Sequence, residues 1–438
     1  MGLERGTHWR LGSRRVLVGS IALVMLAVAG CGSTTAASKP AAAAKINFAV
    51  VAPMTGSQAM LGKFISDPCF AATQEINKDG GILGHKVGCV LVDDTGDPAD
   101  AVPNVTKALS TSSNLVGVVG IDSNVAATVV PIINTAQLPM VSSNGLSFFL
   151  NHYYKYFWRM TPPDIAEGAA MSLWAHKKGF TKIAVVLQND IGDTGNQPGI
   201  LAALKNEGIT PLTNLTIPGD SSSYDSIVNS VRQTNPQVIL MSADTQTMAT
   251  FLSNYKQLNN GSVPAVITPT QVMSPDFFNA ISKDLGSSYL ASKVNFIGAY
   301  LNQQTPTYAA YLAAMEAAKV QNASTVASTG PIGSLYDGMN VEALAMIAAN
   351  STKGSVYDSY LPKVTMARPG AVVVHTFAQG VKELKAGHQI QYVGVVGPVS
   401  FDKYHNSNGW FASFSVNASQ QTSQLGSIGP SELSAALK

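Results

Sequence analysis

Short apolar runs alternate with longer amphipathic stretches along the chain from residue 46 onward. Runs such as 115–119 (Leu-Val-Gly-Val-Val) are apolar throughout, as strands buried on both faces of a parallel sheet are. The pattern predicts strands at 46–51, 87–92, 115–119, 139–141, 156–160, 182–187, 211–217, 238–241, 265–268 and 295–299. It predicts helices at 62–78, 99–109, 124–134, 165–178, 195–206, 224–234, 245–257, 307–319 and 332–349.

Alternation of strand and helix is typical of α/β proteins with doubly wound parallel sheets. Ten strands are more than one such sheet commonly holds, so we predict two doubly wound, Rossmann-like lobes. The length agrees with this, because 438 residues is about three times the ~150 residues of a typical domain. No segment of about 20–50 residues repeats along the chain, which excludes a solenoid.

Composition excludes several classes of protein. An apolar content of 46% is too high for a disordered chain, and three cysteines are too few for a disulfide-rich scaffold. The net charge is only +2, and there is no basic tail or patch, so we expect no nucleic-acid partner.

Motifs of common enzyme classes are missing from the sequence. It contains no Gly-x-Ser-x-Gly elbow, and no Gly-x-Gly-x-x-Gly follows the first predicted strand. The seven histidines do not have the spacing of metal ligands. Asp93 and Asp94 are adjacent at a strand end, where successive side chains point to opposite faces. We therefore expect no enzymatic activity, and we expect neither a metal nor a cofactor.

Residues 1–30 have the features of a secretory signal peptide. Four arginines precede an uncharged run at 16–29, which is shorter than the ~20 residues that a membrane-spanning helix needs. The run ends in Val-Ala-Gly followed by Cys31, which matches the lipobox of bacterial lipoproteins. The paired arginines at 14–15 also resemble a twin-arginine signal, so the export route stays open.

A flexible tether is predicted at 31–44, because 36–44 is almost entirely small residues that cannot form a core. Lipidation of Cys31 would anchor the mature chain to the outer side of the cell membrane. Without the four arginines and one glutamate of residues 1–30, the chain keeps 24 basic and 25 acidic residues. The positive net charge therefore belongs to the signal peptide.

Cys69 and Cys89 form an even pair if Cys31 carries the lipid, which in an exported protein indicates a disulfide. Cys69 lies in a predicted helix and Cys89 in the strand after it. Closing a loop of this length contributes about 3 kcal/mol by chain entropy. Two buried free thiols are the alternative.

Small polar loops follow three of the predicted strands, at 52–57, 120–124 and 142–145. Ligands of open α/β sheets bind outside the carboxyl ends of the strands, and hydroxyl and N–H groups at a helix start can hold an anion. For Asp122, Ser123 or Asn124 taken alone, helix capping is the stronger explanation. Three such loops at one sheet edge favour a binding site.

Several motifs resemble the branched-chain amino-acid-binding proteins, the solute receptors of ABC importers. The segment 46–56 (Ile-Asn-Phe-Ala-Val-Val-Ala-Pro-Met-Thr-Gly) is similar to the family's opening strand and loop. The run 75–87, with Glu-Ile-Asn before a Gly-Gly turn, resembles the most recognisable motif of the family. The segments 93–98 and 157–162 match the next loop and the crossover between lobes. The resemblance extends from residue 46 to about 416 and is weaker in the C-terminal third.

This resemblance implies a type I periplasmic binding fold that closes around a small polar solute, such as an amino acid or an amide. It places one lobe at 45–161 plus 298–393, and the other at 162–297 plus 394–438. The expected partners are an ABC permease and the membrane, through the lipid anchor, and the chain is expected to be a monomer. A receptor that senses a ligand and signals to a partner without transport is the alternative.

The resemblance also implies where the ligand is held. The first lobe would offer Ser123 or Asn124, then Ser143, Asn144 and Gly145, with Leu61 where the family often has an aromatic residue. The residues expected from the second lobe are Asp190, Ile191, Asp244 and Thr245. Tyr336 would lie near the hinge.

One position departs from the family pattern. Amino-acid receptors of this kind place a carboxylate on the second lobe to pair with the ligand ammonium, and here that position is Thr270 or Gln271. An unpaired ammonium in a closed cleft costs several kcal/mol. Either Asp244 or Asp122 replaces that carboxylate, or the ligand is not an α-amino acid. Asp244 is equally well explained as a helix cap.

Overall fold

The computed structural model describes residues 44–56, 58–407 and 409–438, which all belong to one compact unit. The predicted signal peptide, Cys31 and nearly all of the predicted tether lie outside the described residues. Within these ranges, no helix is both long and apolar enough to cross a membrane.

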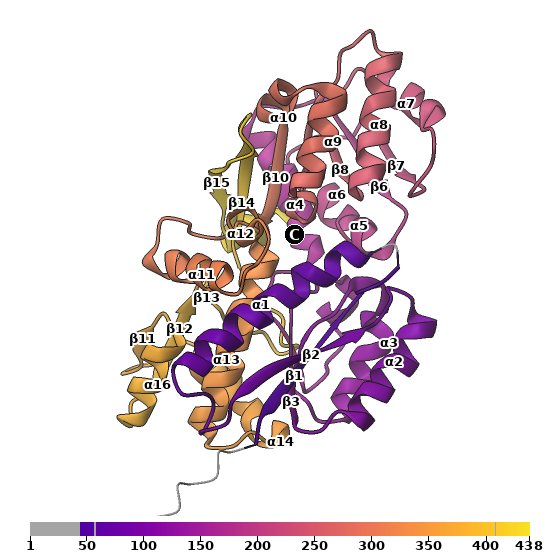
Figure 1. Cartoon of the computed structure of the whole chain (residues 1–438). Helices are drawn as coiled ribbons and strands as arrows, with labels where there is room; N and C mark the ends of the chain where they lie inside the picture. Colours follow the sequence, from indigo (N-terminus) through magenta and orange to yellow (C-terminus); the bar gives the residue numbers. More distant parts are fainter. Residues whose placement is uncertain (1–43, 57, 408) are drawn as a thin grey trace, which may run out of the picture. The chain divides into compact units, whose positions relative to one another are not determined.

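The first sheet is parallel and has five strands in the order β2-β1-β3-β4-β5 (Figure 1). These strands are β1 (Ile46–Ala52), β2 (Val87–Asp93), β3 (Leu115–Gly120), β4 (Met140–Ser142) and β5 (Phe157–Arg159). All five were predicted, because each contains a mainly apolar run, which in β1, β3 and β4 is buried on both faces.

Alternate residues of β1 face two different groups of helices. Phe48 and Val50 pack with α1 (Ala59–Lys78), α11 (Pro306–Ala317) and α13 (Gly330–Ala349). Ala49 and Val51 pack with α2 (Pro98–Thr111) and α3 (Ser123–Thr135). The period of two thus buries both faces of the sheet.

The second sheet has seven strands in the order β15-β14-β10-β9-β8-β6-β7. Its parallel part consists of β6 (Ile183–Gln188), β7 (Thr213–Ile217), β8 (Val238–Ser242), β9 (Ala265–Pro269) and β10 (Val294–Ala299). The antiparallel strands β14 (Phe411–Val416) and β15 (Thr422–Ile428) extend it beyond β10.

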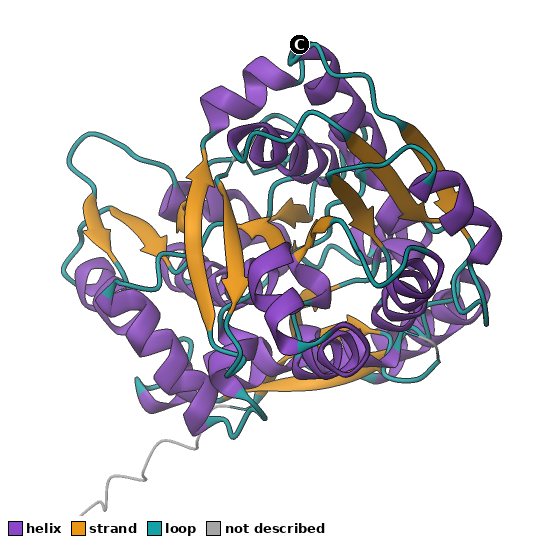
Figure 2. Cartoon of the chain, turned by 90° about the horizontal axis from the view of Figure 1, so that it is seen from above, coloured by secondary structure: helices purple, strands orange, loops and turns teal. Residues whose placement is uncertain are grey.

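Helices lie on both sides of these strands as well (Figure 2). One face packs against α7 (Asp225–Arg232), α8 (Thr245–Leu258), α9 (Pro275–Leu285) and α10 (Ser287–Lys293). The other packs against α4 (Asp164–Lys177), α6 (Gln197–Asn206) and α17 (Pro430–Ala436). The helix predicted at 195–206 corresponds to α6, while the short α5 (Ile191–Gly195) that precedes it was not predicted.

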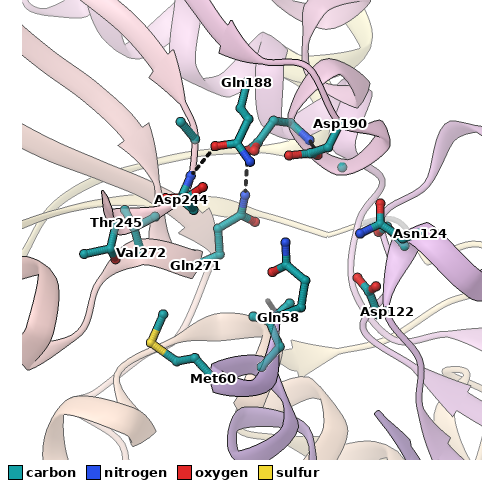
Figure 3. Close-up of a pocket in the computed structure, with 15 residues that line it drawn as sticks. Gln58, Met60, Asp122, Asn124, Gln188, Asp190, Asp244, Thr245, Gln271 and Val272 are labelled. Carbon is teal, nitrogen blue, oxygen red and sulfur yellow. Dashed lines mark hydrogen bonds between the residues drawn. The ribbon is translucent and has the colours of Figure 1, made fainter. Parts of the chain in front are cut away.

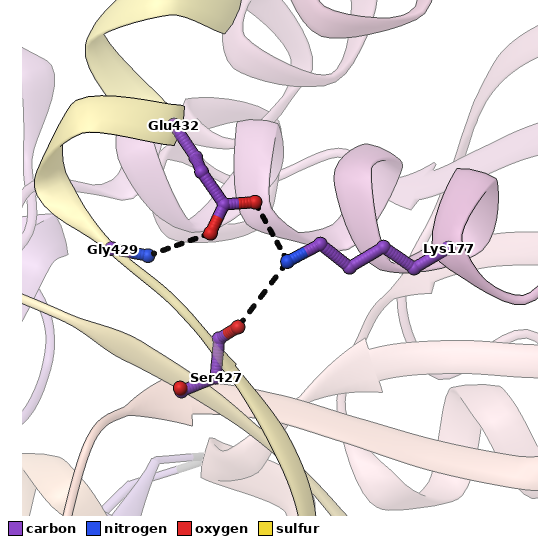
Figure 4. Close-up of polar contacts among 4 residues, drawn as sticks. All are labelled: Lys177, Ser427, Gly429 and Glu432. Carbon is purple, nitrogen blue, oxygen red and sulfur yellow. Dashed lines mark hydrogen bonds and ion pairs between the residues drawn. The ribbon is translucent and has the colours of Figure 1, made fainter.

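Polar contacts hold the C-terminal segment on α4 (Figure 4). Lys177 Nζ lies 2.7 Å from Glu432 Oε2 and donates to the Ser427 carbonyl at 3.3 Å. The Gly429 N–H donates to Glu432 Oε1 at 3.4 Å. The Lys177 ammonium lowers the pKa of Glu432. Both ion-pair side chains are partly exposed, so the pair itself contributes about 0–1 kcal/mol.

The elements that complete the structure are mostly short. They are β11 (Val372–Val374), β12 (Ile390–Gly394) and β13 (Gly397–Pro398), which form a third sheet, with α12 (Ala323–Ala327), α14 (Gly354–Tyr357), α15 (Leu361–Thr365) and α16 (Phe377–Lys385). Three 3₁₀ turns, η1 (Ser147–Leu150), η2 (Thr270–Val272) and η3 (Asp358–Tyr360), complete the described part. The predicted lobe boundaries remain a prediction, and two of them, at 297/298 and 393/394, fall inside β10 and β12.

The structure contains the predicted disulfide between Cys69 and Cys89. It joins α1 to β2, with the two Cα atoms 6.3 Å apart. Both elements belong to the layer beside β1, which is why a helix residue and a strand residue 20 positions apart can meet.

Candidate ligand-binding cleft

Two adjoining cavities lie at the carboxyl ends of the parallel strands of both sheets. In the first sheet the strand order reverses between β1 and β3, and in the second it reverses between β6 and β8. Loops that follow all four of these strands line the cavities. Open α/β sheets bind ligands at such switch points, so we treat the two cavities together as the candidate cleft.

The first cavity, here called the acidic cavity, has four aspartates in its wall (Figure 3). Asp122 reaches in from the first sheet, and Asp190, Asp193 and Asp244 come from the second. The rest of its lining is Gln58, Met60, Leu61, Ser123, Asn124, Gln188, Gly192, Ala243, Thr245, Gln271 and Val272.

The second cavity, here called the apolar cavity, shares Leu61, Asp122, Ser123, Gly192 and Gln271 with the first. The rest of its lining is Phe64, Ile65, Ile121, Ser143, Asn144, Gly145, Asp164, Thr270, Thr329, Pro331, Ile332 and Leu335. The cavities hold about 170 and 150 Å³. Taken together they are close to the ~300 Å³ at which drug-sized pockets begin, which suits a small solute.

Hydrogen bonds fix the loops of the first sheet. Asp93 Oδ1 accepts from the Met54 N–H at 2.9 Å, and its Oδ2 accepts from the Thr55 hydroxyl at 2.6 Å. Asn144 Nδ2 donates to Ser123 Oγ at 3.0 Å and so joins the loop after β4 to the start of α3. The loops are therefore positioned by the chain itself, before any ligand binds.

The backbone before Asp122 is strained. Ile121 has φ +102°, a value that β-branched residues rarely adopt. Strain of this kind is held in place by surrounding structure and is concentrated at functional sites. Here it sets the direction in which the chain enters α3, and thereby the position of the Asp122 side chain.

Burial raises the pKa of Asp122 to about 6, and the nearby charge of Asp190 also raises it. The backbone N–H groups of Asn124 and Ser123 face the carboxylate and act in the opposite direction. Asp122 Oδ2 has no hydrogen-bond partner among the described residues. The start of α3, where the sequence predicted a site for the ligand carboxylate, thus already faces an aspartate of the chain.

In the second sheet, Asp190 caps α5 by accepting from the Asp193 N–H at 2.8 Å. Asp193 Oδ1 in turn accepts from the Ser242 hydroxyl and, at 3.3 Å, from Gln271 Nε2. Burial raises the pKa of Asp193 well above its usual range, with a further contribution from the charge of Asp190. These contacts bring the ends of β6, β8 and β9 together around one carboxyl group.

Asp244 is the cap of α8, one of the two roles considered from the sequence. Its Oδ1 accepts from the Thr247 N–H at 2.8 Å, and its Oδ2 accepts from the Thr247 hydroxyl at 3.0 Å. Gln188 Oε1 accepts from the Asp244 N–H at 3.1 Å (Figure 3). Asp244 still lines the acidic cavity, so capping does not remove it from the candidate site.

Asp164 lies against Gly145 at the start of α4, where its N–H donates to the Gly145 carbonyl at 2.8 Å. Burial raises the pKa of Asp164 to about 7, while the charge of Arg159 lowers it and that of Asp190 raises it. Arg159 is fully buried behind the loop and donates to the carbonyl of Leu146 and to Asn406 Oδ1, both at 2.8 Å. It holds the loop in place and is not part of the cavity lining.

Most of the residues predicted for the site line the cleft. They are Leu61, Ser123, Asn124, Ser143, Asn144, Gly145, Asp190, Asp244, Thr245 and Thr270. Ile191 lines neither cavity and is exposed. Tyr336 also lines neither, and its hydroxyl instead donates to Glu75 of α1. We therefore leave both out of the proposed site.

The sequence analysis did not identify Asp193, which contacts the position where the family pattern would have a carboxylate. Gln271 donates to Asp193, so the carboxylate is supplied by α5 rather than by the loop after β9. The spacing Asp-x-x-Asp after a predicted strand was the available signal. Also missed were Gln58 and Gln188, and the apolar wall formed by α1 and α13.

Metal ligation was considered for the same residues. In the part of the chain that the structure describes, no group of three or more histidine, cysteine, aspartate or glutamate side chains could hold a metal ion.

Sequence comparison supports the arrangement seen here. A sequence model described as "Periplasmic binding protein" matches residues 45–355. The Leu/Ile/Val-binding protein BraC3 of Rhizobium johnstonii is 29% identical over 210 residues, which cover 46% of this chain and 55% of that protein. A leucine-, isoleucine-, valine-, threonine- and alanine-binding protein of Pseudomonas aeruginosa is 24% identical over 230 residues, or 50% and 60% of the two chains. The matches thus span little more than half the length of these relatives.

Solved structures share the fold over nearly their whole length. The leucine-binding protein LivK of Thermotoga maritima superposes with a TM-score of 0.70 at 15% identity, covering 88% of this chain and 99% of that one. A solute-binding protein from R. palustris in complex with 4-hydroxybenzoate gives a TM-score of 0.69 at 16% identity, covering 88% and 97%. At this identity the likeness concerns the fold alone.

Proposed function

Because the chain belongs to the periplasmic binding protein family, we propose that it is an extracytoplasmic receptor that captures a small solute in the cleft. In this proposal it delivers the solute to an ABC permease. The observation that carries the proposal is the cleft itself, in which loops from the switch points of both sheets line two adjoining cavities.

Both sheets supply polar groups to the proposed site. Ser123 and Asn144 come from the first, and Asp190, Asp244 and Thr270 from the second. A solute that contacts both sets favours the state in which they are close, so binding shifts the population toward a closed form. The permease would then recognise this closed form.

The proposed location follows from the first 31 residues of the sequence. A signal peptide and a lipobox ending at Cys31 would leave the folded part outside the cytoplasm and tethered to the membrane. Cys31→Ser is expected to move the protein from the membrane fraction to the soluble fraction. If the variant stays with the membrane, lipidation of Cys31 is not the anchor.

A thermal-shift screen tests solute capture directly. The panel contains amino acids, their amides, amines, urea and small carboxylic acids, each added to the purified protein. A ligand at 100 times its dissociation constant stabilises the protein by about 2.7 kcal/mol, so binders will raise the melting temperature. If no small solute raises it, solute capture is contradicted.

Transport and sensing differ in what is lost when the gene is deleted. For a transport receptor, deletion will abolish high-affinity uptake of the radiolabelled ligand, and the wild-type gene will restore it. Unchanged uptake together with a lost transcriptional or motility response would instead identify a sensing receptor.

A further inference from the structure

We propose that the solute is an aliphatic organic cation with N–H donors, such as a primary amine, rather than a zwitterionic amino acid or an organic acid. This inference rests on the proposed function, since it names the class of solute that the same cleft takes. It is argued from the charge, the unpartnered polar atoms and the shape of the two cavities.

The ionisable side chains that line the cleft are all acidic, although burial raises the pKa of Asp193 and so favours its neutral form. Five aspartates line the cleft, four of them in the acidic cavity and Asp164 in the apolar cavity, whereas no lysine, arginine or histidine is among the described lining residues. Arg159 acts on the charge of Asp164, but it lies behind the wall and is hydrogen bonded to the chain. A ligand with net positive charge would be attracted on approach and paired once bound.

The start of α3, where a ligand anion could bind, already has a carboxylate of the chain beside it. Backbone N–H groups at a helix start are a natural site for a carboxylate, and α3 is positioned to offer them. Here Asp122 immediately precedes α3, and its carboxylate lies beside those N–H groups without capping the helix through a side-chain hydrogen bond. An α-carboxylate of the ligand would have to approach Asp122 itself, and two like charges in a low-dielectric site repel strongly. The site therefore favours an ammonium group and disfavours a carboxylate.

Two buried polar atoms in the wall lack partners within the described residues. Asp122 is only 8% exposed and its Oδ2 has no hydrogen bond; Thr270 is 1% exposed and its Oγ1 has none. Leaving buried polar atoms unsatisfied costs free energy. Both side chains line the apolar cavity, and both offer oxygen acceptors to an N–H donor.

The apolar cavity determines the shape of the rest of the solute. Leu61, Phe64 and Ile65 of α1 face Ile332 and Leu335 of α13 across it. This wall suits a short aliphatic chain. Phe64 is the one aromatic residue among the cavity's described lining residues, whereas recognition of quaternary ammonium groups relies on cages of several aromatic faces. An ammonium that donates hydrogen bonds to carboxylates fits better.

A series of ligands with one shared chain separates charge from shape. The probes are 3-methylbutylamine and leucinamide (cations), leucine (zwitterion) and 4-methylpentanoate (anion), which differ only around the polar head. Isothermal titration of the full-length protein is expected to show that both cations bind about tenfold tighter than leucine, which is one power of ten in the dissociation constant. The anion is expected to bind most weakly.

Substitutions in the cleft test whether its aspartates cause the preference for cations. Asp190→Asn and Asp244→Asn keep a residue that caps helices well but remove one charge each. Each is expected to weaken binding of 3-methylbutylamine about tenfold or more. The control is Asp276→Asn, an exposed aspartate in the first turn of α9 that lines neither cavity. It is expected to bind as the wild type does.

The results of these titrations test the proposed class of ligand separately from the proposed function of solute capture. If leucine or 4-methylpentanoate binds as tightly as the cations, the inference is wrong while solute capture stands. Equal effects of Asp244→Asn and Asp276→Asn would also overturn it, as would binding of calcium chloride in place of the amines. If no member of the series or of the wider panel binds, solute capture fails as well. The comparison among ligands uses the wild-type protein, so it holds whether or not a variant folds.

Discussion

Asp190 and Asp244 each begin a helix and also line the acidic cavity. Their hydrogen bonds to the N–H groups of Asp193 and Thr247 are those of ordinary helix caps. Asparagine caps a helix about as well as aspartate does. The start of each helix therefore needs the side-chain oxygen but not the negative charge, and the charge can be removed without removing the cap.

Gly145 is the residue whose substitution should disturb the cleft most. A Cβ at this position would overlap the Asp164 carboxylate and lie 3.0 Å from the Asp164 backbone nitrogen. Gly145→Ala is expected to lower stability by about 1–3 kcal/mol, as overpacking does, and to weaken ligand binding. Thermal melting and titration measure both effects.

The matched control for that variant is Gly192→Ala, since Gly192, like Gly145, is a glycine that lines the apolar cavity. An added Cβ there meets nothing closer than Asp190 Oδ1 at 3.4 Å, an ordinary contact. It should leave stability nearly unchanged. Equal losses in the two variants would show that Asp164 does not pack against Gly145 as the structure has it.

The pH dependence of binding follows from the raised pKa values of Asp122 and Asp164, about 6 and about 7. Asp190 faces both carboxyls and raises both pKa values, while Arg159 faces Asp164 and lowers its pKa. A bound cation stabilises the ionised carboxylates, so binding releases protons. We expect the affinity for the amine to rise between about pH 5 and pH 8 and then to level off.

Without ligand, the stability of the folded protein depends on pH with the opposite sign. The folded protein holds protons on these two groups that the unfolded chain, with an aspartate pKa near 3.9, has already lost. The free energy of unfolding should therefore fall as the pH rises from about 4 to about 7.

For ligand binding, titration calorimetry in buffers of different ionisation enthalpy counts the protons that are released when the amine binds. An affinity that falls as the pH rises from about 5 to about 8 would contradict the account.

At the scale of elements, the sequence pattern located all ten strands of the parallel parts of the two sheets. It did so because strands buried on both faces are continuous apolar runs, as β1 and β8 are. It missed β14, β15 and the short strands of the third sheet. In β15 most residues are polar and partly or fully exposed, and only Ile428 is buried. Pairing with β14, not hydrophobicity, makes this segment a strand.

The candidate site was predicted in the same uneven way. The loops after β1, β3 and β4 could be identified from the pattern, because parallel strands all end at one edge of their sheet. Those after β6 and β8 were implied by the family resemblance. The wall contributed by α13 could not be identified, since Ile332 lies more than 200 residues from Leu61 in sequence and meets it only across the folded cleft. Asp193 was missed because it lies within the short α5, which was not predicted as a separate helix.

The Cys69–Cys89 disulfide fastens α1 to β2, and α1 supplies Leu61 and Phe64 to the cleft. Replacing both cysteines by alanine is expected to lower the free energy of unfolding by about 3 kcal/mol, as for a loop of this length. Denaturant titration of wild type and variant measures the change. The matched control is reduced wild type, which should unfold with a similar loss.

Thiol labelling tests directly whether the disulfide is formed in the isolated protein. In denatured, unreduced protein, Cys69 and Cys89 should be unlabelled in peptide mass spectrometry. Full labelling of both residues would show that they are free thiols in the isolated protein.

At the scale of the whole molecule, the proposed function requires an open and a closed population, and a bound solute shifts the balance toward the closed one. Residues of both sheets face the same cavities, so a ligand that pairs with both sets favours closure. Small-angle X-ray scattering of the full chain should show a smaller radius of gyration with saturating ligand than without it. The Asp244→Asn variant should need a higher ligand concentration for the same change. An unchanged radius at saturation would exclude closure.

The location of a bound solute tests the central claim most directly. A crystal structure of the protein with its tightest binder from the screen gives that location. The account predicts a solute between the two sheets, with its polar head in contact with Asp122 or Asp190 and its aliphatic part against Leu61 and Ile332. A solute bound outside the two cavities, or held by one sheet alone, would contradict it.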